Sequence, residues 1–247
     1  MKALIFAAGL GTRLRPLTDK LPKALVPVAG KPMLQWVTEK FIASGVTDIV
    51  VNVHHHPDML IDFINNFNYP GIQFHISDER DQLLDTGGGL KKAEVYLNGP
   101  DPFIVHNADV LSNIDLRVML DYHKRKKPLV TLAVSARKTS RHFLWAGCRL
   151  AGWENKISCE KILCQPNEKI ILRPLAFSGI HVLDPKIFSL INETGSFPIK
   201  DLYLRLAASH HIAAYEHDPR HWFDIGSPEK LENAERMIST NYRNDKA

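Results

Sequence analysis

The sequence has few cysteines and no long hydrophobic run. It contains three cysteines in 247 residues, Cys148, Cys159 and Cys164, and their spacing matches no zinc-ligand pattern. We therefore expect free thiols in a reducing cytoplasm. No apolar stretch approaches the length of a membrane span, and the apolar N-terminus, residues 1–10, is too short for a secretion signal. These absences predict a cytoplasmic protein that does not contact a membrane.

Charge of one sign is not concentrated in any part of the chain. The formal net charge is only +4. The densest basic run, residues 124–127, is typical of the solvated end of a helix, which Pro128 closes. We therefore expect no nucleic-acid partner. Hydrophobic residues make up 45% of the sequence, which in a chain of this length is enough for the core of one α/β domain.

The sequence also lacks two common nucleotide-binding strings. The Gly-x-x-x-x-Gly-Lys-Ser/Thr string of an ATPase P-loop is absent. A Gly-x-Gly pair occurs at Gly9 and Gly11, but Leu14 stands where a dinucleotide-binding fingerprint has its third glycine. Pro16 then interrupts the helix that should follow. These differences argue against a nicotinamide-dependent oxidoreductase, which we keep as an alternative.

The glycine pair belongs to a loop that is suited to binding phosphate groups. The loop follows an apolar run at residues 3–6, which we expect to form a buried strand. Two glycines let the backbone approach a ligand closely, and successive backbone N–H groups in such a turn can form an anion-binding concavity. Arg13, Arg15 and Lys23 add positive charge beside it. The stretch therefore predicts a polyphosphate site in a nucleotide-using enzyme.

Apolar runs and helix-like segments alternate over the first 136 residues. We expect strands at residues 3–6, 48–53, 72–76, 102–106 and 129–134, and helices at residues 32–44, 58–67, 90–97 and 115–126. This alternation with short loops predicts an α/β fold with a doubly wound, mostly parallel, Rossmann-like sheet. Residues 137–170 are more polar and predict a small antiparallel insertion, after which an apolar strand at 175–183 returns to the sheet.

Two further motifs lie where strands of such a sheet end. Residues 85–89, Asp-Thr-Gly-Gly-Gly, predict a loop at the ligand-binding edge of the sheet, with backbone groups that can hydrogen-bond a nucleotide base. Residues 54–56 are three histidines, for which a metal site is one interpretation. Adjacent residues rarely converge on one ion, so we favour a loop that crosses the same edge.

Asp109 and Asp224 are the candidate metal ligands. Asp109 follows the expected strand at 102–106 and lies where the two glycine-rich segments should converge. Asp224 follows a short strand and, taken alone, is equally consistent with a turn residue before Gly226. Both carboxylates can meet at one edge of the sheet, and Mg²⁺ is commonly bound by a couple of carboxylates and substrate phosphates.

Taken together, these motifs resemble the sugar-phosphate nucleotidylyltransferases. Residues 9–13 match that family's Gly-x-Gly-Thr-Arg loop, followed by Arg-Pro-Leu-Thr at 15–18 and Pro-Lys at 22–23. Residues 222–226, Trp-Phe-Asp-Ile-Gly, match its second metal motif, and the Asp-Thr-Gly-Gly-Gly string is similar to the N-acetylmuramate-1-phosphate uridylyltransferase branch. The resemblance covers nearly the whole chain and implies the nucleotide-diphospho-sugar transferase fold.

The resemblance implies a reaction and a cofactor. A sugar 1-phosphate and a nucleoside triphosphate, with UTP favoured, would give a nucleotide sugar and pyrophosphate, with Mg²⁺ held by Asp109 and Asp224. Arg13 would stabilise the leaving pyrophosphate, and Lys23 would reach the α-phosphate. The nucleotide would be bound by Ala7, Ala8, Gly9, Gly11, Thr12, Arg13, Lys23, Thr86, Gly87, Gly88 and Asn107.

The sugar phosphate would bind to the C-terminal part of the chain. The resemblance implies that Lys200 holds the phosphate and that Gly147, Ser178 and Gly179 belong to the sugar pocket. We therefore expect one domain spanning residues 1–247, with a nucleotide-binding half at 1–136 and a sugar-binding half at 137–247.

The sequence departs from many relatives just before the strand at 175–183. They carry Glu-Lys-Pro there, and the lysine binds sugar phosphate, whereas this chain has Leu172-Arg173-Pro174. A planar guanidinium fork differs from an ammonium group, so the role of Arg173 and the identity of the sugar stay open.

Several activities remain as hypotheses. The leading one joins N-acetylmuramate 1-phosphate to UTP. The alternatives are a mannose- or heptose-1-phosphate guanylyltransferase and a phosphocholine-type cytidylyltransferase. A non-catalytic sugar-nucleotide sensor is a further alternative, against which the presence of Arg13, Lys23, Asp109 and Asp224 argues. We expect a monomer or a homodimer.

Overall fold

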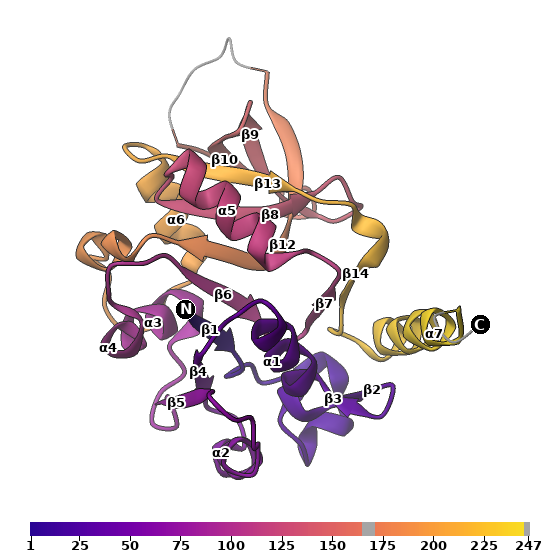
Figure 1. Cartoon of the computed structure of the whole chain (residues 1–247). Helices are drawn as coiled ribbons and strands as arrows, with labels where there is room; N and C mark the ends of the chain where they lie inside the picture. Colours follow the sequence, from indigo (N-terminus) through magenta and orange to yellow (C-terminus); the bar gives the residue numbers. More distant parts are fainter. Residues whose placement is uncertain (165–170, 245–247) are drawn as a thin grey trace.

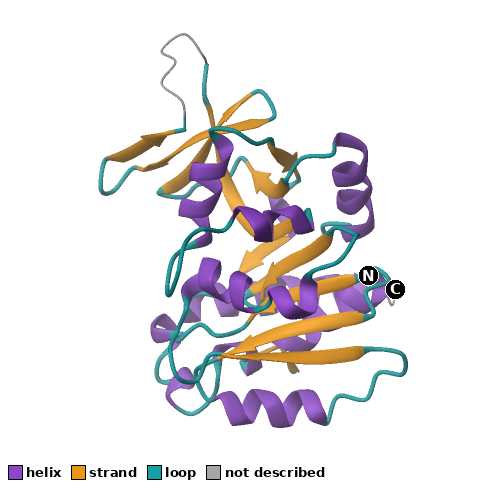
Figure 2. Ribbon diagram, turned by 90° about the vertical axis from the view of Figure 1, so that its left-hand side faces the viewer, coloured by secondary structure: helices purple, strands orange, loops and turns teal. Residues whose placement is uncertain are grey.

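The computed structural model describes residues 1–164 and 171–244, with side chains described up to Ile238. Its main sheet has the strand order β11-β10-β13-β8-β12-β6-β1-β4-β5, and β9 pairs with β10 and β12. Helices lie on both sides of this sheet (Figure 1, Figure 2). This arrangement confirms the predicted α/β fold.

The N-terminal part of the sheet is parallel, as the sequence predicted. Strand β1 (Lys2–Phe6) lies between β6 (Phe103–Asn107) and β4 (Asp48–Val53), and β5 (Gln73–Asp78) forms the edge. The intervening helices are α1 (Met33–Ala43), α2 (Pro57–Asn65), α3 (Asp85–Lys92) and α4 (Glu94–Leu97). Because parallel strands end at one edge, the loops after β1, β4, β5 and β6 lie together.

Side chains of these strands alternate between two hydrophobic cores. Leu4 and Val105 belong to one buried cluster, whereas Ile5 and Ile104 belong to the other. Successive side chains of a strand point to opposite faces, so both faces of the sheet are covered. This explains why the strands appear in the sequence as nearly continuous apolar runs.

The second part of the sheet is mixed. Strand β12 (Arg173–Leu183) runs antiparallel to both β6 and β8 (Val130–Ser135), while β13 (Ile212–Glu216) runs parallel to β8. The predicted antiparallel insertion consists of β9 (Arg141–Ala146), β10 (Arg149–Asn155) and β11 (Glu160–Leu163). It is followed by β12, and α6 (Ile199–Ala207) precedes β13. Strand β13 was not predicted, because Ile-Ala-Ala-Tyr-Glu carries few large apolar side chains.

The prediction of a loop at residues 85–89 is wrong, because these residues form the first turns of α3. A Cβ atom added to Gly87 would lie 2.3 Å from the Phe197 ring, and one added to Gly88 would lie 2.4 Å from the carbonyl oxygen of Gly195. The glycines therefore let the helix pack directly against the chain at 195–197. Only Asp85 has a positive φ, of 56°.

The C-terminal segment returns to the N-terminal half of the chain (Figure 1). Strand β14 (Trp222–Asp224) pairs antiparallel with β7 (Val110–Ser112), and helix α7 (Pro228–Asn244) follows. A third core cluster joins α7 to the hairpin of β2 (Pro27–Val28) and β3 (Lys31–Pro32) through Val28 and Ala234. Short 3₁₀ helices occur at Thr12–Leu14, Leu17–Asp19, Lys23–Leu25, Pro185–Leu190 and Pro219–His221.

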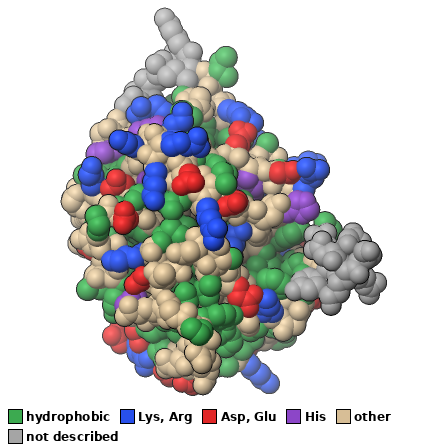
Figure 3. All heavy atoms as spheres, viewed as in Figure 1, with side chains coloured by type: hydrophobic (Ala, Val, Ile, Leu, Met, Phe, Trp, Pro, Cys, Tyr) green, Lys and Arg blue, Asp and Glu red, His purple; other side chains and the backbone are tan. Residues whose placement is uncertain are grey.

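The surface carries charges of both signs. On the face drawn in Figure 3, lysine and arginine side chains are interspersed with aspartate and glutamate side chains. Among the described helices, none is long and apolar enough to cross a membrane.

Candidate active site

Two adjoining cavities open where the parallel strands end. The first cavity has a volume of about 460 Å³, and the second has a volume of about 930 Å³. The first is lined by Phe6, Ala7, Ala8, Gly9, Lys23, Ala24, Asn52, Glu79, Leu83, Asp85, Thr86, Asn107, Ala108, Asp109 and Ser196. Asp85, Asn107 and Asp109 line both cavities. These three residues therefore mark the junction of the two cavities.

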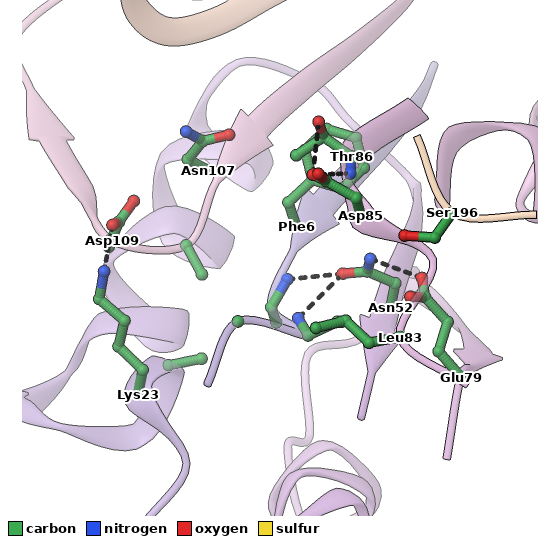
Figure 4. A pocket seen from close by; sticks show the side chains of 15 residues that line it. Phe6, Lys23, Asn52, Glu79, Leu83, Asp85, Thr86, Asn107, Asp109 and Ser196 are labelled. Carbon is green, nitrogen blue, oxygen red and sulfur yellow. Dashed lines mark hydrogen bonds and ion pairs between the residues drawn. The ribbon is translucent and has the colours of Figure 1, made fainter. Parts of the chain in front are cut away.

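The floor of the first cavity is a buried hydrogen-bonded pair, Asn52 and Glu79 (Figure 4). The Asn52 side-chain oxygen accepts hydrogen bonds from the N–H groups of Ala7 and Ala8, at 2.6 and 3.2 Å. The Asn52 amide donates to Glu79 over 2.8 Å, and the backbone N–H of Leu84 donates to the other Glu79 oxygen. Burial raises the pKa of Glu79, against the lowering effect of these hydrogen bonds. Both carboxylate oxygens are thus occupied within the protein.

The glycine loop differs from this floor in its free N–H groups. Among the described residues, no acceptor receives a hydrogen bond from the backbone N–H groups of residues 9–13. Gly11 has a φ of 65°, and a Cβ atom there would lie 2.7 Å from Thr18. The hydroxyl of Thr18 donates to the Gly11 carbonyl over 2.8 Å, which fixes the turn. The loop therefore presents unpaired donors that suit a phosphate ligand.

Asp109 forms an ion pair with Lys23 at the junction of the cavities (Figure 4). Both side chains are largely buried, with 16% of Lys23 and 26% of Asp109 exposed. Lys23 belongs to the glycine-loop segment, and Asp109 follows β6. The ion pair therefore joins the glycine loop to the end of β6, as the sequence analysis expected.

Strand pairing brings Asp224 next to Asp109. Asp224 is the register partner of Val110, the residue after Asp109, and the N–H of Ile225 donates to the Asp109 carbonyl over 2.8 Å. Asp224 itself forms an ion pair with Lys230 on α7. A Cβ atom on Gly226 would lie 2.6 Å from an Asp224 oxygen and 2.8 Å from an Arg13 nitrogen. Gly226 therefore leaves room for the Arg13 guanidinium beside Asp224.

Two of the three consecutive histidines contact backbone carbonyl groups. His54 Nδ1 lies 2.7 Å from the Glu79 carbonyl oxygen, and His55 Nε2 lies 3.0 Å from the Thr18 carbonyl oxygen. In the described part of the chain, no group of three or more histidine, cysteine, aspartate or glutamate residues could hold a metal ion. These contacts agree with the favoured interpretation of a loop.

The second cavity contains most of the basic side chains of the site. Lys200 lies 4.2 Å from the centre of the Trp153 ring and pairs with Asp201 at 2.7 Å. Gly179 has a φ of 74°, and a Cβ atom there would lie 2.9 Å from the Asn107 amide. The cavity is lined by Arg13, Asp85, Asn107, Asp109, Val110, Arg137, Thr139, Ser140, Arg141, Phe143, Trp153, Asn155, Glu160, Phe177, Gly179, Pro198, Lys200, Trp222, Asp224 and Lys230.

Two residues expected in the sugar pocket lie away from the cavities. Ser178 is fully buried, and its hydroxyl lies 2.7 Å from Nε2 of His217. Gly147 lies in the turn between β9 and β10, at the opposite end of the hairpin from Arg141, which lines the second cavity. Successive residues of β12 face opposite sides of the sheet. Phe177 and Gly179 line the second cavity, so the side chain of Ser178 between them points away from it.

Some residues of the nucleotide list are also placed elsewhere. Gly87 and Gly88 lie behind the wall of the first cavity, and their N–H groups donate to the Phe197 carbonyl, at 2.8 and 3.4 Å. Gly11 and Thr12 shape the glycine loop without lining either cavity. The remaining nucleotide-list residues, Ala7, Ala8, Gly9, Arg13, Lys23, Thr86 and Asn107, line one cavity or both.

The structure adds residues that the sequence analysis missed. Asn52 and Glu79 form the floor of the first cavity, and Arg137, Trp222 and Lys230 line the second. Burial lowers the pKa of Arg137, an effect that the charge of Asp224 partly offsets. Asn52 and Glu79 lie at the ends of β4 and β5, so their position after predicted strands was a usable signal. Arg137 and Lys230 belong to no recognisable string.

Comparisons with known proteins agree with this geometry. A family model described as nucleotidyl transferase matches residues 2–241. The chain is 30% identical, over 96% of both chains, to N-acetylmuramate alpha-1-phosphate uridylyltransferase of Caulobacter vibrioides. It is 31% identical to mannose-1-phosphate guanyltransferase of Yarrowia lipolytica, over 92% of this chain but only 61% of that relative. The chain therefore spans less than two thirds of the length of that guanyltransferase.

Solved structures share the fold. A UDP-glucose pyrophosphorylase complexed with UDP-glucose superposes with a TM-score of 0.77 at 22% identity, covering 97% of this chain and 98% of that chain. HddC from Yersinia pseudotuberculosis gives a TM-score of 0.74 at 22% identity, covering 96% and 99%. The architecture is that of the nucleotide-diphospho-sugar transferases. From the family model and the 30% identical relative, this chain belongs to the nucleotidyl transferase family.

Proposed function

We propose that this protein transfers a nucleotidyl group from a nucleoside triphosphate to a sugar 1-phosphate and releases pyrophosphate. The observation that carries the proposal is a pair of carboxylates beside the two cavities. Asp109 lies in the turn between β6 and β7 and lines both cavities, Asp224 ends β14, which pairs with β7, and each carboxylate is paired with a lysine. One cavity adjoins the free N–H groups of the glycine loop, and the other carries basic and aromatic side chains. The arrangement suits two phosphorylated substrates that meet between them.

The reaction needs positioning and charge neutralisation more than proton transfer. An oxygen of the sugar 1-phosphate attacks the α-phosphorus and forms a new P–O bond. The bond from that phosphorus to the bridging oxygen breaks, and pyrophosphate leaves with the electron pair. The attacking oxygen is already ionised, so no general base is required. The main barrier is the approach of two polyanions, which oriented binding and fixed positive charge lower.

The basic residues divide between the two substrates. The free N–H groups of residues 9–13 would hold the triphosphate, and Arg13 would neutralise charge on the leaving pyrophosphate. Lys23 would contact the α-phosphate from the junction, while Lys200 would hold the sugar phosphate from the second cavity. Thr86 and Asn107 line the first cavity and would contact the nucleoside.

Asp109 and Asp224 would hold Mg²⁺. The carboxylate of Asp109, in the turn before β7, and that of Asp224, at the end of β14, both line the second cavity, and carboxylate oxygens are the donors that this hard cation prefers. When bound, the ion neutralises phosphate charge and orients the phosphates. Lys23 and Lys230 keep the two carboxylates compensated and positioned. The donor set is therefore compatible with a divalent cation that arrives with the nucleotide.

UTP and N-acetylmuramate 1-phosphate are the substrates that we favour. The support is the uridylyltransferase relative, which matches this chain over 96% of both lengths. The N–H groups of Gly87 and Gly88 donate to Phe197, so base choice falls instead to groups lining the first cavity, such as Thr86. The guanyltransferase relative with 31% identity favours GTP and mannose 1-phosphate as the second candidate pair. The three free thiols agree with a cytoplasmic compartment.

A pyrophosphate-release screen tests this proposal. UTP, CTP, GTP and dTTP are each combined with N-acetylmuramate, mannose, glucose and heptose 1-phosphates and with phosphocholine, with Mg²⁺ present. We expect UTP to exceed GTP by about tenfold in kcat/KM, which needs only about 1.4 kcal/mol of differential transition-state binding. Better use of GTP would contradict the uridylyl assignment alone. No release with any pair would contradict the nucleotidylyl function.

A further inference from the structure

Arg137 is fixed at the edge of the sheet without being part of the glycine loop or of a metal motif. It comes two residues after the end of β8, and its backbone N–H donates to the Ser135 carbonyl over 3.1 Å. Its half-buried side chain lines the second cavity. The backbone at Arg137 is therefore fixed next to the second cavity.

The side chain of Arg137 is oriented by an aromatic ring and a carbonyl group. The guanidinium lies 3.8 Å from the centre of the Trp222 ring, and it donates to the carbonyl of Phe177. The Trp222 ring is in turn fixed by its N–H, which donates to the Ser178 carbonyl over 2.8 Å. Stacking on an indole holds a guanidinium without neutralising it. The charge of Arg137 is thus positioned but not cancelled.

The charge of Arg137 has no ion-pair partner among the described residues. The nearby carboxylate of Asp224 is paired with Lys230 instead. The Nε–H of Arg137 is buried and makes no hydrogen bond within the described structure. A buried donor without an acceptor is costly, and the planar fork of a guanidinium matches two phosphate oxygens. These features indicate an anion that completes the site.

Arg173 differs from Arg137 in each of these respects. It lies outside both cavities, its side chain is 57% exposed, and it donates to the Glu216 carboxylate over 2.6 Å. Arg173 occupies the position of the family lysine in the sequence, but its charge is neutralised by Glu216 outside the cavities. Arg137, in contrast, lines the second cavity and has no ion-pair partner among the described residues.

We propose that Arg137 binds the phosphate group of the sugar 1-phosphate and presents it beside Asp224. The inference rests on the proposed function and adds a second residue, besides Lys200, that holds the sugar phosphate in this chain. Trp222 and Asp224 belong to the same short strand, β14, so a phosphate held on Arg137 lies next to the carboxylate proposed for Mg²⁺. This position is where the attacking oxygen is needed.

Steady-state kinetics of Arg137→Gln give the first test. We expect the KM for the sugar 1-phosphate to rise on the order of tenfold to a hundredfold, because a charged hydrogen-bonded contact is lost. The KM for the triphosphate should change by less than about twofold, since Arg137 would contact the sugar phosphate and not the triphosphate. Arg173→Gln is the matched control and should leave both values unchanged. An unchanged KM for sugar phosphate, or an equal rise in both, would overturn the proposal.

A binding measurement separates this inference from the proposed activity. Trp222 fluorescence is titrated with inorganic phosphate and with sugar 1-phosphates, in the presence of a non-reactive triphosphate analogue. Trp222→Phe identifies the signal. We expect saturable quenching that Arg137→Gln abolishes and Arg137→Lys weakens, even if the turnover screen fails. Equal phosphate affinity in the wild type and in Arg137→Lys, whose charge is kept but whose fork is lost, would contradict the assignment. That variant also serves if Arg137→Gln does not fold.

Discussion

The two cavities hold their polar groups in different ways. In the first cavity, Asn52 and Glu79 are buried, and their side chains form hydrogen bonds with each other and with backbone N–H groups. In the second, Arg137 and Lys200 are stacked on tryptophan rings at 3.8 and 4.2 Å. Internal hydrogen bonds fix backbone position, whereas an aromatic ring fixes the position of a charge without neutralising it. The first cavity is therefore built to hold a loop in place, and the second to meet an anion.

The junction between the cavities should be the most sensitive point. We expect Asp109→Asn and Asp224→Asn each to lower kcat by about a hundredfold or more, because each removes a charge that is needed where the substrates meet. Asparagine has nearly the size and shape of aspartate, so the circular dichroism spectrum should stay close to that of the wild type. Near-normal, Mg²⁺-dependent turnover in both variants would show that these carboxylates do not hold the ion.

Lysines on the two sides of the junction should separate by substrate. Lys23→Ala is expected to depress kcat and to weaken triphosphate use, because Lys23 lies in the glycine-loop segment and pairs with Asp109. Lys200→Ala should mainly raise the KM for the sugar 1-phosphate, by about tenfold, because it removes a cation from the second cavity only. Each variant is titrated against each substrate. A reversed pattern would contradict the division between the cavities.

Substitution of a glycine in α3 tests whether these glycines serve close packing or base recognition. Gly87→Ala places a Cβ atom 2.3 Å from the Phe197 ring, and we expect it to lower the free energy of unfolding by about 1–3 kcal/mol. Gly99→Ala, whose nearest neighbour would be the Lys2 ammonium at 3.7 Å, is the control and should have little effect. Urea denaturation measures both. A stable Gly87→Ala protein with altered base preference would instead support direct contact of this helix with the base.

Two buried histidines should make the sheet sensitive to acid. Burial lowers the pKa of His106 and of His181 to about 3, from an ordinary value of 6.5. Below pH 6.5 the unfolded chain binds protons that the folded chain does not, so stability falls as the pH falls toward 3. Between pH 7 and pH 5 the loss is roughly 2 kcal/mol per histidine. Urea unfolding at both pH values measures it, and His106→Gln should reduce the difference. Equal stability at both pH values would contradict the account.

The comparison of the cavities also explains what the sequence could predict. The glycine loop, Asp109 and Asp224 belong to short strings next to apolar strands, and the strands themselves follow from runs of buried side chains. The loop at residues 85–89 was mispredicted because glycines suggest flexibility, whereas here they permit close packing against Phe197. Arg137 could not be singled out, because its role depends on a contact with Trp222. Trp222 is distant in the sequence, and the pairing of β14 with β7 brings it to Arg137.

The same contrast applies to Ser178 and Gly147. The alternation of β12 turns Ser178 toward His217 while its neighbours line the second cavity, and alternation can be assigned only once the strand's register is known. Gly147 lies at the wrong end of a hairpin whose direction the sequence did not give. Contiguous backbone motifs were therefore predictable, whereas side chains gathered from separate strands were not.

The central claim is that one site joins the two phosphorylated substrates at the junction of the cavities. Phosphorus NMR of a reaction with UTP, Mg²⁺ and N-acetylmuramate 1-phosphate tests it most directly, because it identifies the bond that forms. We expect two coupled diphosphate resonances of a nucleotide sugar, together with an equal amount of pyrophosphate, and no product when either substrate is omitted. Formation of nucleoside monophosphate or inorganic phosphate, or pyrophosphate release without the sugar phosphate, would contradict the account.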